Sequence, residues 1–190
     1  GGGRGGAMGG GGALLAVPVG RDSPAGTVVA GFDGVRAVAQ YEVEFTGQPA
    51  HAGAHPEDGS HAIAAAATAT HQLQAIARHA DGATRVNVGR IDGGTATNII
   101  PESCALEFEV RGETTALCDH MRERATAILE GAARSHGCGV EWRVMGEAPS
   151  ATSDASLVDV VATAAEGASC PLYTSPSPRD QRGTPMAVYA

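Results

Sequence analysis

The 190-residue chain contains no lysine, few aromatic residues and no long apolar run. All 13 basic residues are arginine, against 21 acidic residues, and the formal net charge is −8. Nucleic-acid-binding proteins usually carry a basic face, so this balance argues against a nucleic-acid partner. No apolar run approaches the roughly 18 residues of a membrane span, and the glycine-rich start lacks the basic and apolar regions of a signal peptide. We therefore expect a cytoplasmic protein that binds neither nucleic acid nor membrane.

Cysteine is also sparse, and its spacing excludes the common metal-binding pairs. The four cysteines, Cys104, Cys118, Cys138 and Cys170, form no C-x-x-C motif. Small secreted scaffolds depend on disulfides, whereas a chain of this length can bury a core of its own. Hydrophobic residues make up 43% of the sequence, as in ordinary globular proteins. The cysteines are therefore predicted to be reduced thiols in or near the core.

From Tyr41 to Val144 the hydrophobic pattern switches between the period of a strand and that of a helix. Strict alternation of apolar and polar residues is typical of half-buried strands, and apolar residues three and four apart are typical of amphipathic helices. Turn and capping residues separate the segments. The pattern predicts strands at 41–46, 85–91, 106–111 and 140–144, and helices at 60–80 and 114–136.

This order of elements predicts an α+β fold, a ferredoxin-like βαββαβ two-layer sandwich. Right-handed crossovers place both helices on one face of an antiparallel sheet and leave the other face uncovered. The alternation places Glu107, Glu109 and Arg111 on the uncovered face. In this topology the strands 85–91 and 140–144 form the two edges of the sheet.

Three polar residues outside the predicted core are candidate site residues. His51 lies in the loop after the first strand, Asn98 lies in the loop after Gly93-Gly94, and Arg111 lies on the uncovered face. Amide and guanidinium groups can bind a carboxylate, and histidine can donate or accept protons. Taken singly, each has a plainer explanation: a surface histidine, a turn residue, and an arginine paired with a glutamate across the sheet.

Taken together, the motifs around these residues resemble those of a known enzyme family. They read A-H-A-G-x-x-P from Ala50, V-N-V-G-x-I-x-G-G-T-A-x-N-x-I-P from Val86, and E-V-R from Glu109. This combination resembles the dimerisation (lid) domain of the co-catalytic zinc amidohydrolase and peptidase family, which includes carboxypeptidase G and aminoacylase. The segments T-R-V-N-V-G and E-V-R-G-E are most similar to members that hydrolyse p-aminobenzoyl-glutamate.

The resemblance implies a role for each candidate residue. His51 is similar to the lid histidine that reaches the active site of the partner subunit and stabilises the tetrahedral intermediate, as an oxyanion-hole donor does. Asn98 and Arg111 are similar to the pair that holds the free carboxylate of the substrate.

The resemblance also implies a substrate, a metal and an assembly. The substrate is p-aminobenzoyl-glutamate or another N-acyl amino acid, and the full-length enzyme contains two Zn or Mn ions. No metal ligand is identified in this chain, and no bound metal is expected. The lid domain forms a homodimer, and a second, different subunit is left open.

Only part of the family's catalytic domain is recognised in this sequence. Residues 1–36 resemble a remnant of that domain after a glycine-rich start, residues 37–147 the dimerisation domain, and residues 148–169 the start of the return to the catalytic domain. Residues 170–190 resemble a translated sequencing-library adapter, and we expect them to be disordered. Pro18 stands where this branch of the family has a metal-binding histidine. We therefore expect a fragment that is inactive alone; the alternatives are a stand-alone ferredoxin-like binding module and a degenerate, non-hydrolytic relative.

Overall fold

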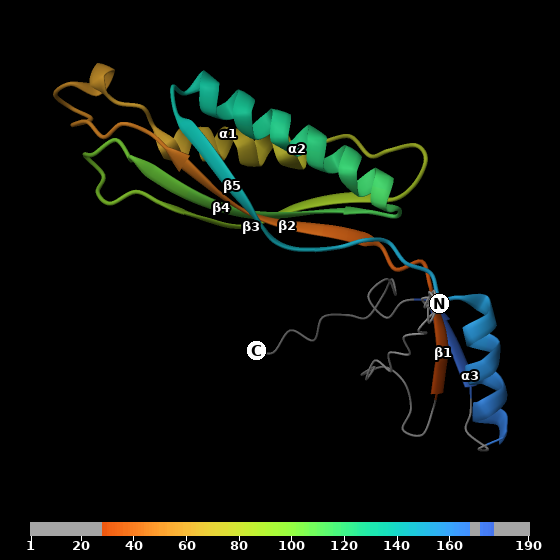
Figure 1. Ribbon diagram of the computed structural model, residues 1–190. Coiled ribbons are helices and arrows are strands. Elements are labelled where there is room, and N and C mark those ends of the chain that lie inside the picture. Colours follow the sequence, from red (N-terminus) through yellow and green to blue (C-terminus); the bar gives the residue numbers. More distant parts are fainter. Residues whose placement is uncertain (1–27, 168–171, 177–190) are drawn as a thin grey trace, which may run out of the picture. The chain divides into compact units, whose positions relative to one another are not determined.

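The computed structural model describes residues 28–167 and 172–176, which belong to two compact units. The larger unit, Asp33–Ser153, contains a four-stranded sheet and two long helices (Figure 1). It encloses the segment 37–147 that is predicted as the dimerisation domain. No helix among the described residues is long and apolar enough to cross a membrane.

The larger unit has the predicted order of strand, helix, strand, strand, helix, strand. Its elements are β2 (Ala37–Thr46), α1 (Ala62–Gln74), β3 (Thr84–Gly93), β4 (Ser103–Gly112), α2 (Thr115–Ser135) and β5 (Gly139–Ala148). The sheet order is β3-β4-β2-β5, and all neighbouring strands are antiparallel. Both helices cover the same face of the sheet (Figure 1). The ferredoxin-like sandwich is therefore confirmed, with β3 and β5 as its edges.

The core lies between the two helices and the sheet, and it follows from the strand alternation. On β4, Leu106 and Val110 are fully buried, whereas the intervening Glu107 and Glu109 are partly exposed. Successive residues of a strand point to opposite faces, so the polar set lies on the uncovered face as predicted. Helix α1 contributes mostly alanine to the core, which lets its backbone lie close to the sheet. Its buried residues are Ala62, Ala65, Ala66, Ala69 and Leu73.

Helix α1 is shorter than the predicted helix at 60–80. His61 caps its first turn, because its ring Nδ1 accepts a hydrogen bond from the backbone N–H of Ala64 at 3.2 Å. At the other end the chain leaves the helix after Gln74 and turns toward β3. There the buried hydroxyl of Thr84 accepts the backbone N–H of His79 at 3.2 Å. A tertiary hydrogen bond thus replaces the last predicted turns, which local helix propensity does not foresee.

The smaller unit contains helix α3 (Ala155–Gly167) and a two-stranded sheet of β1 (Val28–Asp33) and β6 (Leu172–Pro176). The Asp154 carboxylate accepts two backbone N–H groups in the first turn of α3 and thereby caps it. Strand β6 lies in the segment predicted to be disordered; these five residues form a strand because β1 offers an edge with unpaired backbone groups. Pro18 and the rest of the predicted glycine-rich and adapter-like segments lie outside the described residues.

The cysteines in the described part of the chain are free thiols, as predicted. Cys104 and Cys118 are buried in the core of the larger unit, and Cys138 is half-buried. Burial raises the pKa of all three thiols above the ordinary value. The thiols are therefore protonated at neutral pH and behave as small apolar side chains.

Two glycines provide a matched test of this packing. A Cβ on Gly112, at the end of β4, would lie 2.2 Å from the backbone nitrogen of Cys118. Because backbone must move, we expect Gly112→Ala to lower the free energy of unfolding by about 1–3 kcal/mol. Gly131 lies within α2, and a Cβ there meets nothing within 4 Å. Gly131→Ala should therefore raise the free energy of unfolding by roughly 0.5–1 kcal/mol, because alanine favours helix.

Urea denaturation of the two variants and the wild-type chain measures both effects. Opposite signs at the two positions support the close approach of β4 to the first turn of α2. A Gly112→Ala protein as stable as wild type would contradict that approach.

Candidate functional site

Two loops meet at one end of the sheet and carry two of the candidate residues. His51 lies in the loop that follows β2, and Asn98 lies in the loop between β3 and β4 (Figure 1). A short backbone ladder joins the loops: the N–H of Ala52 donates to the carbonyl of Asn98, and the N–H of Ile100 donates to that of Ala50, each at 2.9 Å. The ladder pairs His51 with Ile99, so the tertiary structure brings the His51 loop next to the Asn98 loop. We call this pair of loops, residues 47–60 and 94–102, the tip.

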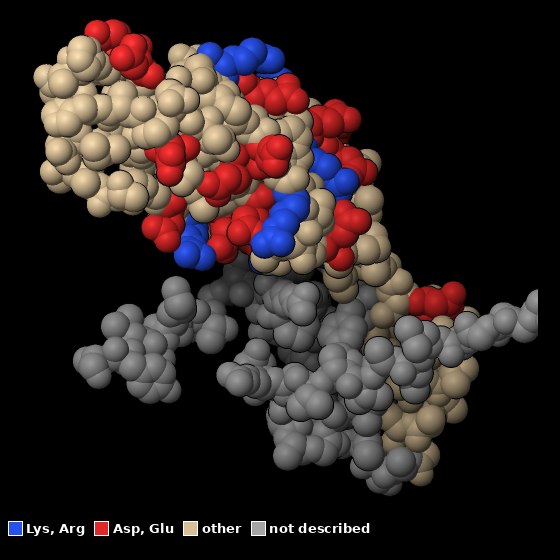
Figure 2. Space-filling model, turned by 60° about the vertical axis from the view of Figure 1, so that its left-hand side comes forward, with Lys and Arg blue, Asp and Glu red and all other residues tan. Residues whose placement is uncertain are grey.

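The tip combines a constrained backbone with exposed side chains. Gly94 adopts a φ of +85°, which favours glycine, and a Cβ on Gly59 would lie 2.5 Å from the Ile100 side chain. The His51 and Asn98 side chains are both exposed. The tip contains no lysine or arginine, and its only acidic residues are Glu57, Asp58 and Glu102. In Figure 2 that end of the domain is largely free of charged side chains except at its rim. The tip can therefore offer neutral hydrogen-bond donors to a ligand or partner.

The backbone of the tip also fixes the tautomer of His51. The N–H of Gly53 donates to His51 Nδ1 at 3.1 Å. A ring nitrogen that accepts a hydrogen bond carries no proton, so the neutral ring holds its proton on Nε2. No group in the described part of the chain accepts a hydrogen bond from Nε2. His51 therefore presents one neutral N–H donor for a group from outside the loop.

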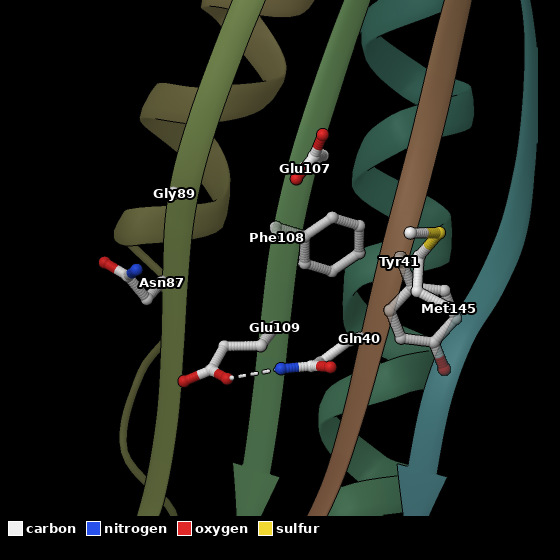
Figure 3. A pocket seen from close by; sticks show the side chains of 8 residues that line it. All are labelled: Gln40, Tyr41, Asn87, Gly89, Glu107, Phe108, Glu109 and Met145. Carbon is white, nitrogen blue, oxygen red and sulfur yellow. Dashed lines mark hydrogen bonds between the residues drawn. The ribbon is translucent and has the colours of Figure 1, made fainter.

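Arg111 lies at the other end of β4, on the uncovered face. Its Nε and Nη2 donate to the two carboxylate oxygens of Glu109 at 2.8 and 3.1 Å. Gln40 Nε2 donates to the same carboxylate at 3.4 Å, the bond drawn in Figure 3. The Arg111 guanidinium holds the pKa of Glu109 below its ordinary value. Glu109 is therefore ionised at neutral pH and keeps the arginine in one orientation. The plainer explanation expected an arginine–glutamate pair across the sheet. The observed pair instead joins two residues of the same strand, β4.

A hollow of about 240 Å³ lies on the uncovered face next to this ion pair. Figure 3 shows that its polar side chains come from adjacent strands: Gln40 from β2, Glu109 from β4 and Asn87 from β3, with Met145 of β5 beside them. Tyr41 and Phe108 also line it, so the hollow offers donors and acceptors next to apolar surface, as binding surfaces for small molecules do.

One chain does not bring Arg111 together with the tip. Arg111 is eight residues along β4 from Ser103, which borders the tip. A strand rises about 3.4 Å per residue, so the two ends lie about 27 Å apart. Asn98 and Arg111 therefore do not reach the same carboxylate within one chain, although the resemblance pairs them.

The described residues hold no metal centre. Among residues 28–167 and 172–176, no group of three or more His, Cys, Asp and Glu side chains is placed to hold a metal ion. These residues do not fit the two Zn or Mn ions that the resemblance implies for the full-length enzyme. The candidate residues in the described part of the chain can donate hydrogen bonds and can bind a carboxylate.

The sequence placed Glu109 on the same face as Arg111, because residues two apart on a strand share a face, although the pair was expected to run across the sheet. Gln40 was missed, because it approaches Glu109 only through the register of β2 with β4. Alternation is a local signal, whereas register depends on the pairing of distant segments.

Comparison with known proteins shows which family the chain is similar to. Residues 34–137 match the M20 peptidase dimerisation domain. The chain is 47% identical over 135 residues to one of the subunits of p-aminobenzoyl-glutamate hydrolase from Escherichia coli (strain K12), covering 71% of this chain and 31% of that protein. It is 46% identical over 137 residues to indole-3-acetyl-aspartic acid hydrolase of Enterobacter agglomerans, covering 72% of this chain and 31% of that protein.

A solved structure shows the same fold. The crystal structure of an aminobenzoyl-glutamate utilization protein from Klebsiella pneumoniae superposes with a TM-score of 0.78 and 39% identity, covering 83% of this chain and 42% of that chain. The chain thus spans about a third of the length of the curated relatives it matches.

The tautomer of His51 is directly measurable. At a pH where the ring is neutral, ¹⁵N NMR should show His51 Nδ1 unprotonated and Nε2 protonated in almost all molecules, because Gly53 donates to Nδ1. His71 is exposed on α1 and has no ring hydrogen bond among the described residues, so it should show a mixture. A similar mixture at His51 would contradict the fixed tautomer.

Proposed function

Because the chain belongs to the M20 peptidase dimerisation domain family, we propose that it supplies the lid of a metal-dependent amidohydrolase. The proposed reaction is hydrolysis of the amide bond of p-aminobenzoyl-glutamate or a similar N-acyl amino acid. The relatives' names specify p-aminobenzoyl-glutamate and indole-3-acetyl-aspartic acid, which both join an acyl group to an amino acid through an amide. The observation that carries the proposal is the tip, where a backbone ladder joins the loop of His51, whose Nδ1 accepts from Gly53, to the loop of Asn98.

His51 can stabilise the transition state of such a reaction. As water adds to the amide carbon, negative charge develops on the carbonyl oxygen, and a preorganised N–H donor lowers the barrier. The Nε2–H of His51 is such a donor, since Gly53 holds the tautomer. The metal ions of the family, when bound, activate the water. The chain alone is proposed to be inactive, because its described residues contain no metal-binding group of side chains.

Asn98 and Arg111 suit the recognition of a substrate carboxylate. The Asn98 side-chain amide offers two N–H donors. Glu109 occupies the Nε and Nη2 edge of Arg111, so the edge formed by Nη1 and the second hydrogen of Nη2 remains for a ligand. Arginine presents its donors in a planar fork that matches a carboxylate with two parallel hydrogen bonds.

The separation of these residues calls for two chains. A small substrate cannot span the roughly 27 Å of β4 between the tip and Arg111. All three residues can contact one substrate only if His51 and Asn98 come from one chain and Arg111 from its partner. This distance supports the proposed homodimer, as does the family of the chain.

Strand β3 and helix α1 suit a two-fold dimer contact. β3 is an unpaired edge of the sheet, and Ile91 on it is 48% exposed. The adjacent helix exposes small residues such as Ala67, which permit a close approach. Pairing of β3 with its own copy would remove this edge in a closed dimer.

The assembly and the compartment of the full-length protein complete the proposal. The word "subunit" in the name of the E. coli relative supports a second, different subunit in addition to the homodimer. The free thiols of Cys104, Cys118 and Cys138 suit a reducing, cytoplasmic location.

Two substitutions of equally exposed residues distinguish the edges. Ile91→Lys on β3 should convert the dimer to monomers, because it places a charge in the proposed contact. Val144, which is 51% exposed on the opposite edge β5, is the control, and Val144→Lys should leave the dimer intact. Ile91 is the better position for this substitution than Val88, because Val88 packs against the core and a lysine there would also disturb the fold. Light scattering gives the mass, and circular dichroism verifies the fold; monomers from Val144→Lys alone would contradict the β3 contact.

Activity is tested in a full-length chimaera in which residues 34–153 replace the aligned segment of the E. coli relative. Release of p-aminobenzoate from p-aminobenzoyl-glutamate should fall by roughly 100-fold or more in His51→Ala, the scale of losing one oxyanion donor. His55 lies in the same loop, and its ring lies 3.8 Å from Glu57 while its other bonds are made by the backbone, so His55→Ala should retain activity. The 190-residue chain alone should release none, with or without Zn²⁺ or Mn²⁺.

Mixed dimers test whether His51 acts across the two protomers. A His51→Ala chimaera mixed with a metal-site variant of the E. coli portion should recover part of the activity, because one hybrid site then has both parts. Mixed dimers that form without any recovery would show that His51 does not serve the partner's site.

A further inference from the structure

Two arginines lie directly opposite each other on the uncovered face. The register of β3 with β4 pairs Arg85 with Arg111. Opposite residues of an antiparallel pair point to the same face, with Cβ atoms about 4.5–5.5 Å apart. Like charges in this position destabilise a sheet, so the pair is unfavourable unless an anion lies between the two guanidinium groups.

Arg85 differs from the other arginines on the strands of this sheet. Arg90 pairs with Glu107 and Asp92, Arg143 pairs with Glu42, and Arg111 pairs with Glu109. Arg85 is exposed and donates only to the backbone carbonyl of Thr84, through Nη1 at 2.7 Å, and no carboxylate of the described residues pairs with it.

The carboxylates at this end of the sheet are engaged by other groups. Glu109 pairs with Arg111, and the Glu113 carboxylate accepts the backbone N–H of Ala83 at 2.8 Å, so neither pairs with Arg85. Acidic and basic side chains alternate on the surface of the domain in Figure 2, with the acidic ones more abundant. A cation that the fold leaves without a partner in such surroundings is suited to an anionic ligand.

We propose that Arg85 and Arg111 together bind a dicarboxylate, and that Arg85 determines the preference for N-acyl amino acids with an acidic side chain. The inference rests on the proposed function, in which Arg111 binds the free α-carboxylate. The side-chain carboxylate of a glutamate or aspartate residue lies a few ångströms from its α-carboxylate, close to the spacing of the two arginines. Arg85 retains its Nε and Nη2 donors for that second group.

The structure also explains why Arg111 alone would not make this distinction. Glu109 and Gln40 hold the Arg111 fork in one orientation, so it presents one edge and accommodates one carboxylate. Asn87, the neighbour opposite Glu109, is uncharged and adds no second positive charge. Of the two β3 residues opposite Arg111 and Glu109, Arg85 is the one that can bind a second negative charge.

The test compares two substrates that differ only in this charge. In the full-length chimaera, kcat/KM is measured for p-aminobenzoyl-glutamate and for p-aminobenzoyl-glutamine, whose side-chain amide is close to isosteric. The glutamate substrate should be preferred by roughly 10- to 100-fold, the range expected for a hydrogen bond to a charged group. Arg85→Gln should abolish this preference by raising KM for the glutamate substrate, with kcat and the glutamine kinetics almost unchanged.

Matched variants separate charge recognition from a structural effect. Arg90→Gln alters an arginine on the same strand that already has carboxylate partners, and the preference should remain. Arg85→Lys should restore part of the preference, because the charge is kept while the fork is lost. Arg111→Gln should weaken both substrates, since both have the α-carboxylate. An unchanged preference in Arg85→Gln, or an equal loss for both substrates, would overturn the inference.

Binding measurements keep this result independent of the proposed reaction. Calorimetric dissociation constants for N-acetyl-glutamate and N-acetyl-glutamine should show the same preference and its loss in Arg85→Gln. A chimaera that binds with this preference but hydrolyses neither substrate would contradict the proposed function alone. Equal affinity of the wild-type chimaera for both ligands would contradict the role of Arg85.

Discussion

The unbroken antiparallel pairing of β2 with β4 determines which side chains enter the core and which reach the uncovered face. Ten consecutive residue pairs join the strands without a bulge, from Ala37 with Gly112 to Thr46 with Ser103. A slip of one residue would turn Glu109 and Arg111 into the core and Val110 out of it, at the cost of burying two charges. The same pairing extends past the strands, where the N–H of Gly47 donates to the carbonyl of Glu102 at 2.7 Å, and leads directly into the tip.

The two ends of this strand pair have different chemistry. At the tip, backbone hydrogen bonds fix two loops whose exposed His51 and Asn98 are neutral donors. At the other end, side-chain ion pairs orient Arg111 on an open surface. Exposed ion pairs contribute little to stability, so the Glu109 contact matters more for the direction of the guanidinium than for the folding free energy. One end thus suits developing charge on a reacting group, and the other suits a carboxylate that stays charged throughout.

The length of the sheet connects these two ends to the proposed assembly. A single chain cannot place both on one small molecule, and a two-fold dimer is the simplest arrangement that can. This places a constraint on the edge strand β3, which carries both the proposed dimer contact around Ile91 and Arg85, the residue proposed to bind a second carboxylate. Substitutions on β3 are therefore best interpreted by measuring association and substrate preference separately.

The sequence by itself determined the features that depend on local periodicity. Alternation predicted the four strands and the polar face that holds Arg111, and the order of elements predicted the edges β3 and β5. Only the tertiary structure decided the features that depend on pairing between distant segments. These are the end of α1 at Gln74, the ladder between the His51 and Asn98 loops, and the position of Arg85 opposite Arg111. The physical reason is that a side chain's face follows from its own strand, whereas its neighbours follow from backbone hydrogen bonds that form only when the whole sheet assembles.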